Sequence, residues 1–490
     1  MAAFRFRVGG APSSEPTQHR RATGTAAAIT LAGALWLVGV AEGGPTEADQ
    51  QLVPASFPSA SSVNELGTQS RRSTHGNFEA PSISVQSEPA LARPRPRLAF
   101  DRDEYLAMWM EQRLERDEEF VATPLTFPDS EVVYSQGAME FDIERFVTDK
   151  GGFLKVYREQ IAGHWMTGAE IVERVAQNHS INPRLLLAII EHQSRWVSDP
   201  VRPPEGPFHF PIVASDRRLQ GLYLQLTWTA DVLSRGYYGW RQDSYTAELS
   251  EDRPNAGTEA IRQLSMRLCS NAECRNDLIG TYYGLFGDPW KFGVEIHEEN
   301  LFQPQLILPF PRNNEWVLTG GPHAAWGSES PWAALDFAPK WDSSRQTSDM
   351  EVVAIADSTV ARVDHGILVL DLDGDGYEQT GWSIFYLHIA AADWVRVGAR
   401  VNQGQIIGEA SSAGGVADGD HLHIARKYNG EWIPVVGPVP LNLSGWRVHS
   451  GASEYDGGLY MEGRGCTLTV LVGDSLHPSL FQECRSEDLA

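Results

Sequence analysis

The pattern of apolar and polar positions predicts helices in the middle of the chain. Between residues 98 and 300, apolar residues recur at the three- and four-residue spacing of a helix, as in DEYLAMWMEQRLERDEEF. TGAEIVERVAQNHSINPRLLLAIIEHQSRWV predicts two helices broken at Asn182-Pro183, and Thr167 with Glu170 forms a capping-box signature at the start of the first. We therefore expect an all-α domain over residues 98–300.

After residue 300 the pattern changes to short apolar, β-branched runs between Gly-rich turns. WSIFYLHI reads as a strand that ends in His388, and LDFA as a buried strand that carries Asp336. VVAIADSTVARV and VRVGARVNQGQIIGEA predict further strands. We expect a mostly antiparallel β domain over residues 301–445 and a C-terminal extension over residues 446–490, so that the whole chain is a multidomain α+β protein.

The first hundred residues lack these patterns. Four arginines precede an uncharged stretch at residues 22–41, which predicts that residues 1–42 are either a secretory signal or a membrane anchor. Residues 43–97 are rich in Ser, Pro, Gly and Gln without apolar periodicity, so we expect a disordered linker there. Both features place the protein outside the cell or on its surface.

Composition narrows the choice of partners. The 490 residues carry 64 acidic against 40 basic side chains, a net charge of −24, which argues against nucleic acid as a partner. The four cysteines form two local pairs. In a secreted chain we expect disulfides Cys269–Cys274 and Cys466–Cys484, whereas in a cytosolic one they would be reduced thiols.

Histidine and aspartate side chains recur in the predicted strands and turns. His421 and His423 stand two residues apart in DHLHI, where a strand directs both rings to one face. His323 precedes the strand that carries Asp336, and His388 ends another strand. A catalytic zinc site needs three nitrogen or oxygen ligands and one open position for water. Two histidines and one aspartate satisfy this need and leave two histidines for acid/base work.

The motifs GGPH, LDFAP, YLHI and GDHLHIA, in this order, resemble the zinc endopeptidases of the lysostaphin and β-lytic type, which cut peptides of bacterial cell walls. The long interval between the first two motifs is closer to the β-lytic branch. The resemblance covers well under half of the chain. It implies zinc ligands at His323, Asp336 and His423, and a catalytic pair at His388 and His421.

The helical part shows a second, weaker resemblance. INPRLLLAIIEHQS, QGLYLQLTWTA and TYYGLFGDPW, in this order, are similar to the lysozyme-like fold of lytic transglycosylases. In that family a catalytic Glu directly precedes Ser, but this chain has Gln193, and an amide cannot donate the required proton. Glu191 lies about 200° away around a helix. We therefore expect a degenerate module in which Gln193 contacts glycan, or a spacer; an unrelated all-α domain is the alternative.

One further motif suggests a second cation. Asp371, Asp373 and Asp375 alternate with Leu and Gly as in a calcium-binding loop. The closing Glu of an EF-hand is missing, because Trp382 falls at the twelfth position, and the flanking runs predict the tip of a hairpin. A structural Ca²⁺ site and a metal-free acidic turn are equally compatible with this pattern.

These observations favour one function over another. The leading hypothesis is a secreted or surface-anchored zinc endopeptidase that hydrolyses peptide bonds in peptidoglycan cross-bridges or stem peptides. The alternative is a non-catalytic scaffold that binds or regulates the cell wall. Tyr428 and Tyr455 are candidates for contacts with substrate.

Overall fold

The computed structural model describes residues 126–213, 216–246, 254–268, 273–298, 300–312, 314–340, 350–462 and 465–468. The predicted signal or anchor, the linker and the helix in DEYLAMWMEQRLERDEEF lie outside these ranges, and so do Cys269, Cys484 and the side chains of Cys274 and Cys466. Residue contacts divide the chain into two units, 1–95 and 96–490, and the second contains every described residue. The predicted boundaries within that unit remain predictions.

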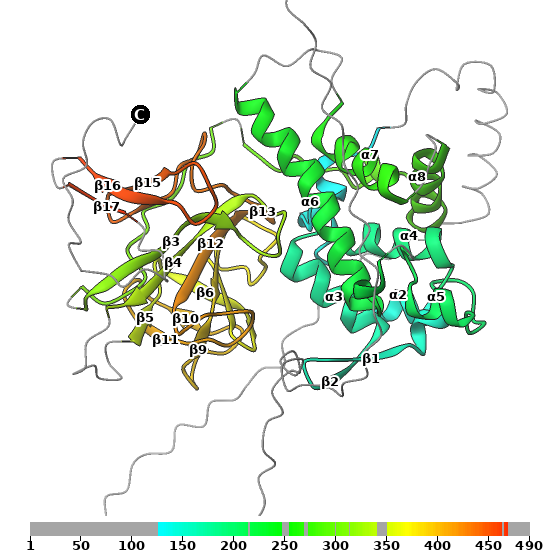
Figure 1. Cartoon of the computed structure of the whole chain (residues 1–490), viewed down its shortest axis with the longest axis horizontal. Helices are drawn as coiled ribbons and strands as arrows, with labels where there is room; N and C mark the ends of the chain where they lie inside the picture. Colours follow the sequence, from blue (N-terminus) through cyan, green and yellow to red (C-terminus); the bar gives the residue numbers. More distant parts are fainter. Residues whose placement is uncertain are drawn as a thin grey trace, which may run out of the picture. The chain divides into compact units, whose positions relative to one another are not determined.

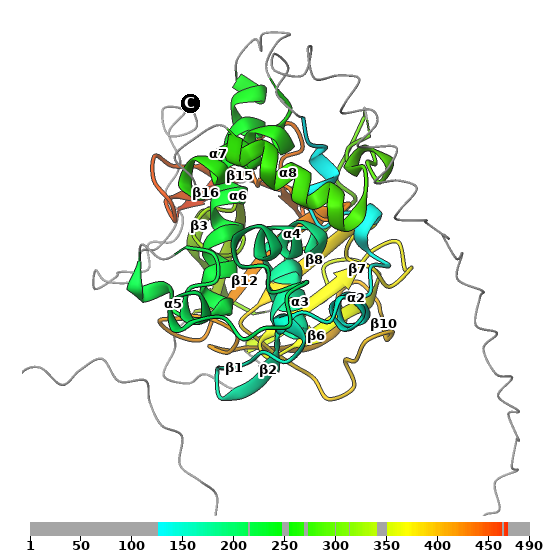
Figure 2. The same cartoon turned by 90° about the vertical axis from the view of Figure 1, so that its right-hand side faces the viewer.

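The helices lie in the first half of the described chain, drawn in cyan and green in Figure 1. Their bounds are α2 Ile143–Lys150, α3 Gly168–His179, α4 Pro183–Ser194, α5 Glu205–His209, α6 Leu222–Thr246, α7 Ala256–Leu268 and α8 Glu273–Phe286. Figure 2 shows α4 beside α3 and α8. Buried aliphatic residues of α3, α4 and α6 form the centre of this region's core.

The capping signals predicted from sequence are present. The Thr167 hydroxyl accepts from the Glu170 amide at 3.0 Å, and the Glu170 carboxylate accepts from the Thr167 amide at 2.6 Å. These two bonds satisfy amides that no helical carbonyl reaches. The next helix begins at Pro183, after the side chain of Asn182 accepts from the Arg184 amide. The predicted break between α3 and α4 is therefore confirmed.

The expectation of an all-α region was wrong, because this region also contains a β-hairpin. Strands β1 Arg158–Ile161 and β2 His164–Thr167 pair in antiparallel register, with Ile161 opposite His164. The two-residue turn consists of Ala162 and Gly163, both with positive φ. Such a turn matches the twist of a hairpin, but Ala-Gly lacks the usual Asn or Asp at its first position, so the sequence signal was weak.

The strands after residue 315 form antiparallel sheets, as predicted (Figure 1). The largest sheet has the order β10-β6-β7-β8-β12-β4-β3, with β13 also paired to β12. Its strands are β3 Trp316–Ala324, β4 Trp332–Pro339, β6 Ser358–Asp364, β7 Ile367–Asp371, β8 Trp382–Leu387, β10 Arg400–Val401, β12 Leu422–Tyr428 and β13 Glu431–Trp432. Smaller sheets contain β5 Glu351–Val353, β9 Ile389–Ala391 and β11 Ile406–Ala410, and then β14 Asn442–Leu443, β15 Trp446–Ser450, β16 Gly457–Met461 and β17 Gly465–Leu468.

The central strand β12 has two buried faces. Successive side chains of a strand point to opposite faces. Leu422 and Ile424 belong to the hydrophobic core on one side of the sheet, whereas Ala425 belongs to the core that continues into the helices. His423 and Lys427 alternate in phase with Ala425 and so share the helix-facing side.

Polar contacts join the helices to this side of the sheet. The Lys427 ammonium donates to the Gln177 carbonyl at 3.3 Å, and Arg362 of β6 donates to Asn178 at 2.8 Å. Glu431 of β13 accepts from Tyr237 at 2.8 Å and from Arg241 at 3.0 Å. One side of the sheet thus carries the histidines at one end and the contacts to the helices at the other.

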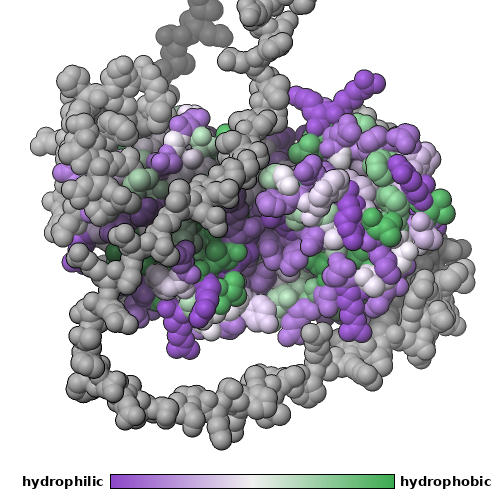
Figure 3. Space-filling view, turned by 90° about the horizontal axis from the view of Figure 1, so that it is seen from below, coloured by the Kyte–Doolittle hydropathy of each residue, from purple (hydrophilic) through white to green (hydrophobic). Residues whose placement is uncertain are grey.

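The exterior fits an acidic protein. The face drawn in Figure 3 is mainly hydrophilic, with hydrophobic residues in scattered groups. Among the described residues, no helix has both the length and the apolar character needed to cross a membrane. The stretch at residues 22–41 lies outside them, so its predicted role as signal or anchor stays a prediction.

Candidate metal centre

Three strands position the predicted ligands. β12 lies between β8 and β4, and its His423 stands directly opposite Asp336 of β4. His323 lies near the end of β3, where the pairing with β4 is irregular between Leu318 and Ala324. Gly320 stands opposite Asp336, and a Cβ there would approach the Asp336 carboxylate to 2.6 Å. Gly320 therefore makes room for the Asp336 side chain.

The three predicted ligand side chains converge. Nε2 of His323 lies 2.9 Å from Nδ1 of His423, and Oδ1 of Asp336 lies 3.2 Å from each of these nitrogens. Ligands on a tetrahedral zinc, with bonds of about 2.05 Å, stand roughly 3.3 Å apart. All three residues are buried, and their ligand atoms form a group able to hold one metal ion.

The remaining ring nitrogens of the two histidines explain why a cation fits there. Nδ1 of His323 lies 2.7 Å from the Gly321 carbonyl, and Nε2 of His423 lies 3.0 Å from the Ala325 carbonyl. Since a carbonyl oxygen only accepts, these nitrogens carry the protons, and a neutral ring then offers a lone pair from its other nitrogen. Oδ1 of Asp336 is buried and accepts no hydrogen bond. Two nitrogen lone pairs and a carboxylate oxygen without a hydrogen-bond partner therefore face one point. A divalent cation at that point would coordinate all three donors.

The other two predicted residues flank this group. His388 follows β8 directly and has a φ of 60°, which turns the chain between β8 and β9. Its ring lies 4.4 Å from the ring of His421, and Nε2 of His421 lies 3.9 Å from Oδ1 of Asp336. Nδ1 of His388 is held by the Ala413 carbonyl and Nδ1 of His421 by the Gly419 carbonyl, each at 2.8 Å. In both rings Nε2 remains available to take or give a proton.

Burial and neighbouring charges shift the ionisation of these groups. Burial raises the pKa of Asp336, but the adjacent rings of His323 and His423, when they are charged, outweigh it and hold the pKa well below its usual range. Burial and the nearby His421 lower the pKa of His388 to about 4. Burial also lowers the pKa of His423. A neutral His388 near pH 7 can accept a proton, as a general base must.

A loop beyond the predicted β domain completes the surroundings. The Tyr455 ring stacks on His323 with centroids 4.3 Å apart, and its backbone bonds with Gly321 and Pro322. Beside it, Glu454 accepts from the Ala324 amide at 2.9 Å. Sequence reasoning named Tyr455 only as one of two candidate tyrosines and missed Glu454. Tyr428, the other candidate, packs on Trp382 at the far end of β12.

The remaining predicted sites lie elsewhere. Oxygens of Asp371, Asp373 and Asp375 lie close enough together to hold an ion, at the predicted hairpin tip between β7 and β8. Gln193 lies half-buried in the last turn of α4 and takes no part in the contacts of the metal centre. The Glu191 carboxylate accepts hydrogen bonds from the amide and the hydroxyl of Ser198, at 3.0 and 2.5 Å.

Comparison with known families finds a match in each of two parts of the chain. Residues 341–434 match the family described as peptidase family M23, and residues 125–300 match the family described as LasA, N-terminal domain. The second match replaces the expected lysozyme-like relationship, which is not supported. Helical periodicity and short motifs indicate that helices form, but they do not specify which helical fold results.

Individual proteins are similar to different shares of the chain. Protease LasA of Pseudomonas aeruginosa is 25% identical over 369 residues, which cover 69% of this chain and 80% of LasA. Among solved structures, the deep-sea M23 metalloprotease pseudoalterin is 22% identical and covers 34% of this chain and 95% of its own, with a TM-score of 0.29. The catalytic domain of lysostaphin from Staphylococcus simulans is 23% identical and covers 25% of this chain and 90% of its own, with a TM-score of 0.19. With scores this low, no functional conclusion rests on the two structures.

The M23 match covers part of the cluster described above. It spans His388, His421 and His423, and it begins at residue 341, after His323 and Asp336. The LasA relationship extends beyond this domain into the helical part. The C-terminal part of this chain is thus similar to lysostaphin-type M23 peptidases, the helical part is similar to the N-terminal domain of LasA, and the chain is a metalloendopeptidase.

Proposed function

We propose that this protein is an extracellular zinc endopeptidase that hydrolyses peptide bonds in peptidoglycan cross-bridges or stem peptides. One observation carries the proposal: Nε2 of His323, Oδ1 of Asp336 and Nδ1 of His423 converge within 3.2 Å of one another. Nitrogen and carboxylate donors of this number are those of catalytic zinc sites. The resemblance to wall-lytic peptidases supplies the substrate class.

The roles of the residues follow from their positions. His323, Asp336 and His423 would hold the metal. Bound zinc supplies a Lewis acid for the scissile carbonyl and lowers the pKa of a coordinated water toward neutrality. His388 and His421, each with Nδ1 fixed on a backbone carbonyl, are placed to take the water proton and to return a proton to the leaving amine.

Tyr455 adds a further group at this edge of the site. Its ring is partly exposed and stacks on His323, so its hydroxyl borders the region where substrate would approach the metal. Burial, with Asp336 and Glu454 nearby, raises the pKa of Tyr455, so the phenol keeps its proton near neutral pH. It can therefore donate a hydrogen bond to substrate.

Three finer assignments belong to the same proposal. Residues 22–41 would direct the chain out of the cell, as a cleaved signal or as an anchor. The four cysteines would then pair as two disulfides. Asp371, Asp373 and Asp375 would bind Ca²⁺, and equilibrium dialysis with ⁴⁵Ca on wild type and Asp373→Asn tests this: one ion lost in the variant supports the site, and no bound ion removes it.

The full chain tests the leading function. We expect about one zinc per chain by elemental analysis, and release of free amino groups from purified peptidoglycan that stops with a chelator and returns with added zinc. A chain with the exposed His365 changed to Ala is the matched control and should behave as wild type. A chain without zinc and without release would replace the enzyme by the wall-binding scaffold. A chain that binds zinc but releases no amino groups from peptidoglycan would show that the assigned substrate is wrong.

A further inference from the structure

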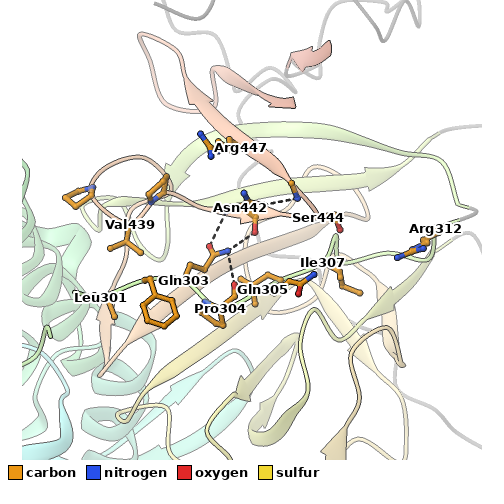
Figure 4. A pocket seen from close by; sticks show the side chains of 15 residues that line it. Leu301, Gln303, Pro304, Gln305, Ile307, Arg312, Val439, Asn442, Ser444 and Arg447 are labelled. Atoms are coloured by element: carbon orange, nitrogen blue, oxygen red, sulfur yellow. Dashed lines mark hydrogen bonds between the residues drawn. The ribbon is translucent and has the colours of Figure 1, made fainter. Parts of the chain in front are cut away.

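A second cleft lies on the other side of β12 from the ligand His423. It has a volume of about 730 Å³, within the size range of ligand sites. Its walls are the segment 301–307, which leads into the M23 domain, and residues 438–447 around β14 and β15. Figure 4 shows Gln303 and Asn442 in its middle, joined by hydrogen bonds, with Arg312 and Arg447 further out.

The charge of this cleft opposes that of the whole chain. Its lining includes Arg312 and Arg447 but neither Asp nor Glu. Within the described residues, neither guanidinium forms an ion pair, and both side chains are exposed. A chain of net charge −24 therefore presents a cationic cleft here. Guanidinium groups recognise carboxylates in two-pronged geometry, so the cleft favours an anionic ligand.

A third arginine lies directly behind the lining. Arg426 of β12 is 1% exposed, and it donates to the side chain of Gln303 and to the carbonyls of Pro434 and Val439. These acceptors are neutral, so no carboxylate in the described chain compensates this buried charge, and its Nε has no acceptor. Burial lowers the pKa of Arg426 to about 9, so the group stays protonated near pH 7. Its field adds to that of the two exposed arginines.

The backbone beside the cleft favours a peptide over other anions. Residues 301–305 form no regular element, and Leu306 makes only one isolated bridge, to Leu443. Within the described part of the chain, the amides of Phe302, Gln303 and Gln305 donate to no protein group. An extended segment with free amides can pair with another extended chain, and Phe302, at 77% exposure, offers an apolar contact beside it.

We propose that this cleft binds an extended acidic peptide, whose carboxylates reach Arg312 and Arg447 while its backbone pairs with residues 302–305. The site is separate from the metal centre, because Arg426 and His423 project from opposite faces of β12. Binding here does not depend on the proposed hydrolysis. In a wall-lytic enzyme it would hold a carboxylate-bearing peptide on the sheet face away from the metal.

Fluorescence anisotropy on the full chain tests the proposal. The probe is a labelled repeat peptide of Glu and Gly, and the matched peptide has Gln in place of Glu. We expect the Glu peptide to bind and the double variant Arg312→Ala/Arg447→Ala to weaken that binding about tenfold, because it removes both exposed cations of the cleft and exposed ion pairs contribute modestly. Arg396→Ala, which removes an exposed arginine elsewhere, is the charge-matched control and should retain wild-type affinity.

Two further arms separate specific binding in the cleft from general attraction between opposite charges. Binding of the Glu peptide should persist in the His323→Ala chain, which keeps the cleft but loses a predicted metal ligand, so failure of the enzymatic proposal leaves this one testable. Equal affinity for the Glu and Gln peptides, or equal weakening by Arg396→Ala, would overturn the proposal in favour of non-specific attraction. Zinc content and thermal unfolding of the double variant should match wild type, which excludes misfolding as the cause.

Discussion

The two ends of β12 hold buried charges on the same face, but they differ in how those charges are compensated. At one end, Oδ1 of Asp336 meets two imidazole lone pairs and accepts no hydrogen bond. At the other, Glu378 is paired with Arg362 at 2.8 Å and with Lys427 at 2.9 Å. A buried carboxylate that is paired with cationic side chains can support the packing of two regions. A buried carboxylate that faces only lone pairs is stabilised when a cation binds.

The same difference appears in the ionisation of the two acids. Burial raises the pKa of Glu378, but the cations of Arg362 and Lys427 outweigh it and leave the pKa lowered. The pKa of Asp336 is low only where its two histidine neighbours act as charged partners. Arg362 and Lys427 are charged and stabilise the Glu378 carboxylate by themselves. Neutral imidazoles do not compensate the charge of Asp336, so a bound metal is needed to stabilise that carboxylate. The comparison therefore predicts that substitutions at the Asp336 end change metal binding and catalysis. Substitutions at the Glu378 end should change the free energy of unfolding.

The largest expected effect comes from removing a donor at the ligand end. His323→Ala should lose bound zinc and lower peptidase activity by about three orders of magnitude, because the several kcal/mol that a catalytic metal supplies disappear. Elemental analysis and amino-group release measure both quantities. An active, zinc-loaded variant would contradict the assigned ligand set.

Removing a flanking histidine should separate catalysis from binding. His388→Ala should keep about one zinc per chain and lower the turnover rate by about 10²-fold, the lower end of the usual contribution of a general acid or base. Zinc content and turnover are measured on the same preparation. If turnover stayed at the wild-type level, the role assigned to His388 would be wrong.

At the helix-facing end, Glu378→Gln should act on stability. It leaves Arg362 and Lys427 buried without a carboxylate, which should lower the free energy of unfolding by about 3 to 5 kcal/mol. Glu315→Gln, which breaks the exposed pair with Lys340, is the control and should cost less than about 1 kcal/mol. Urea unfolding gives both values, and zinc content should stay unchanged. Equal costs would remove the distinction between matched buried and exposed pairs.

The smallest expected effect is a pH dependence carried by Glu431. Burial raises its pKa, but Arg241, His297 and Tyr237 outweigh it and lower the pKa to about 2, against an ordinary value of 4.5. The unfolded chain then binds a proton that the folded chain does not, so stability is full above pH 4.5 and declines as the pH falls toward 2. The decline should amount to a few kcal/mol. Unfolding midpoints at about pH 6, 4 and 3, which run from above this window into it, should fall less steeply for Glu431→Gln than for wild type.

Local sequence signals were sufficient for many of the elements. The capping box at Thr167 and the proline at 183 delimited two helices, because caps and prolines act on their immediate neighbours. Apolar runs with aliphatic or aromatic residues indicated the strands that became β7, β8 and β12. The hairpin at 158–167 was not predicted because its turn residues are unusual. The expected lysozyme-like relationship was not supported because helix patterns do not encode how helices pack.

The chemistry and order of the donor residues were readable from the sequence alone, since residue type determines which atoms can ligate or carry protons. Tertiary structure decided what those donors face. The register of β12 on β4 sets His423 opposite Asp336, and an irregular β3 brings His323 to the same point. The loop with Tyr455 and the cleft around Gln303 join segments distant along the chain. Such juxtapositions depend on strand pairing and core packing over the whole domain, and no local pattern specifies them.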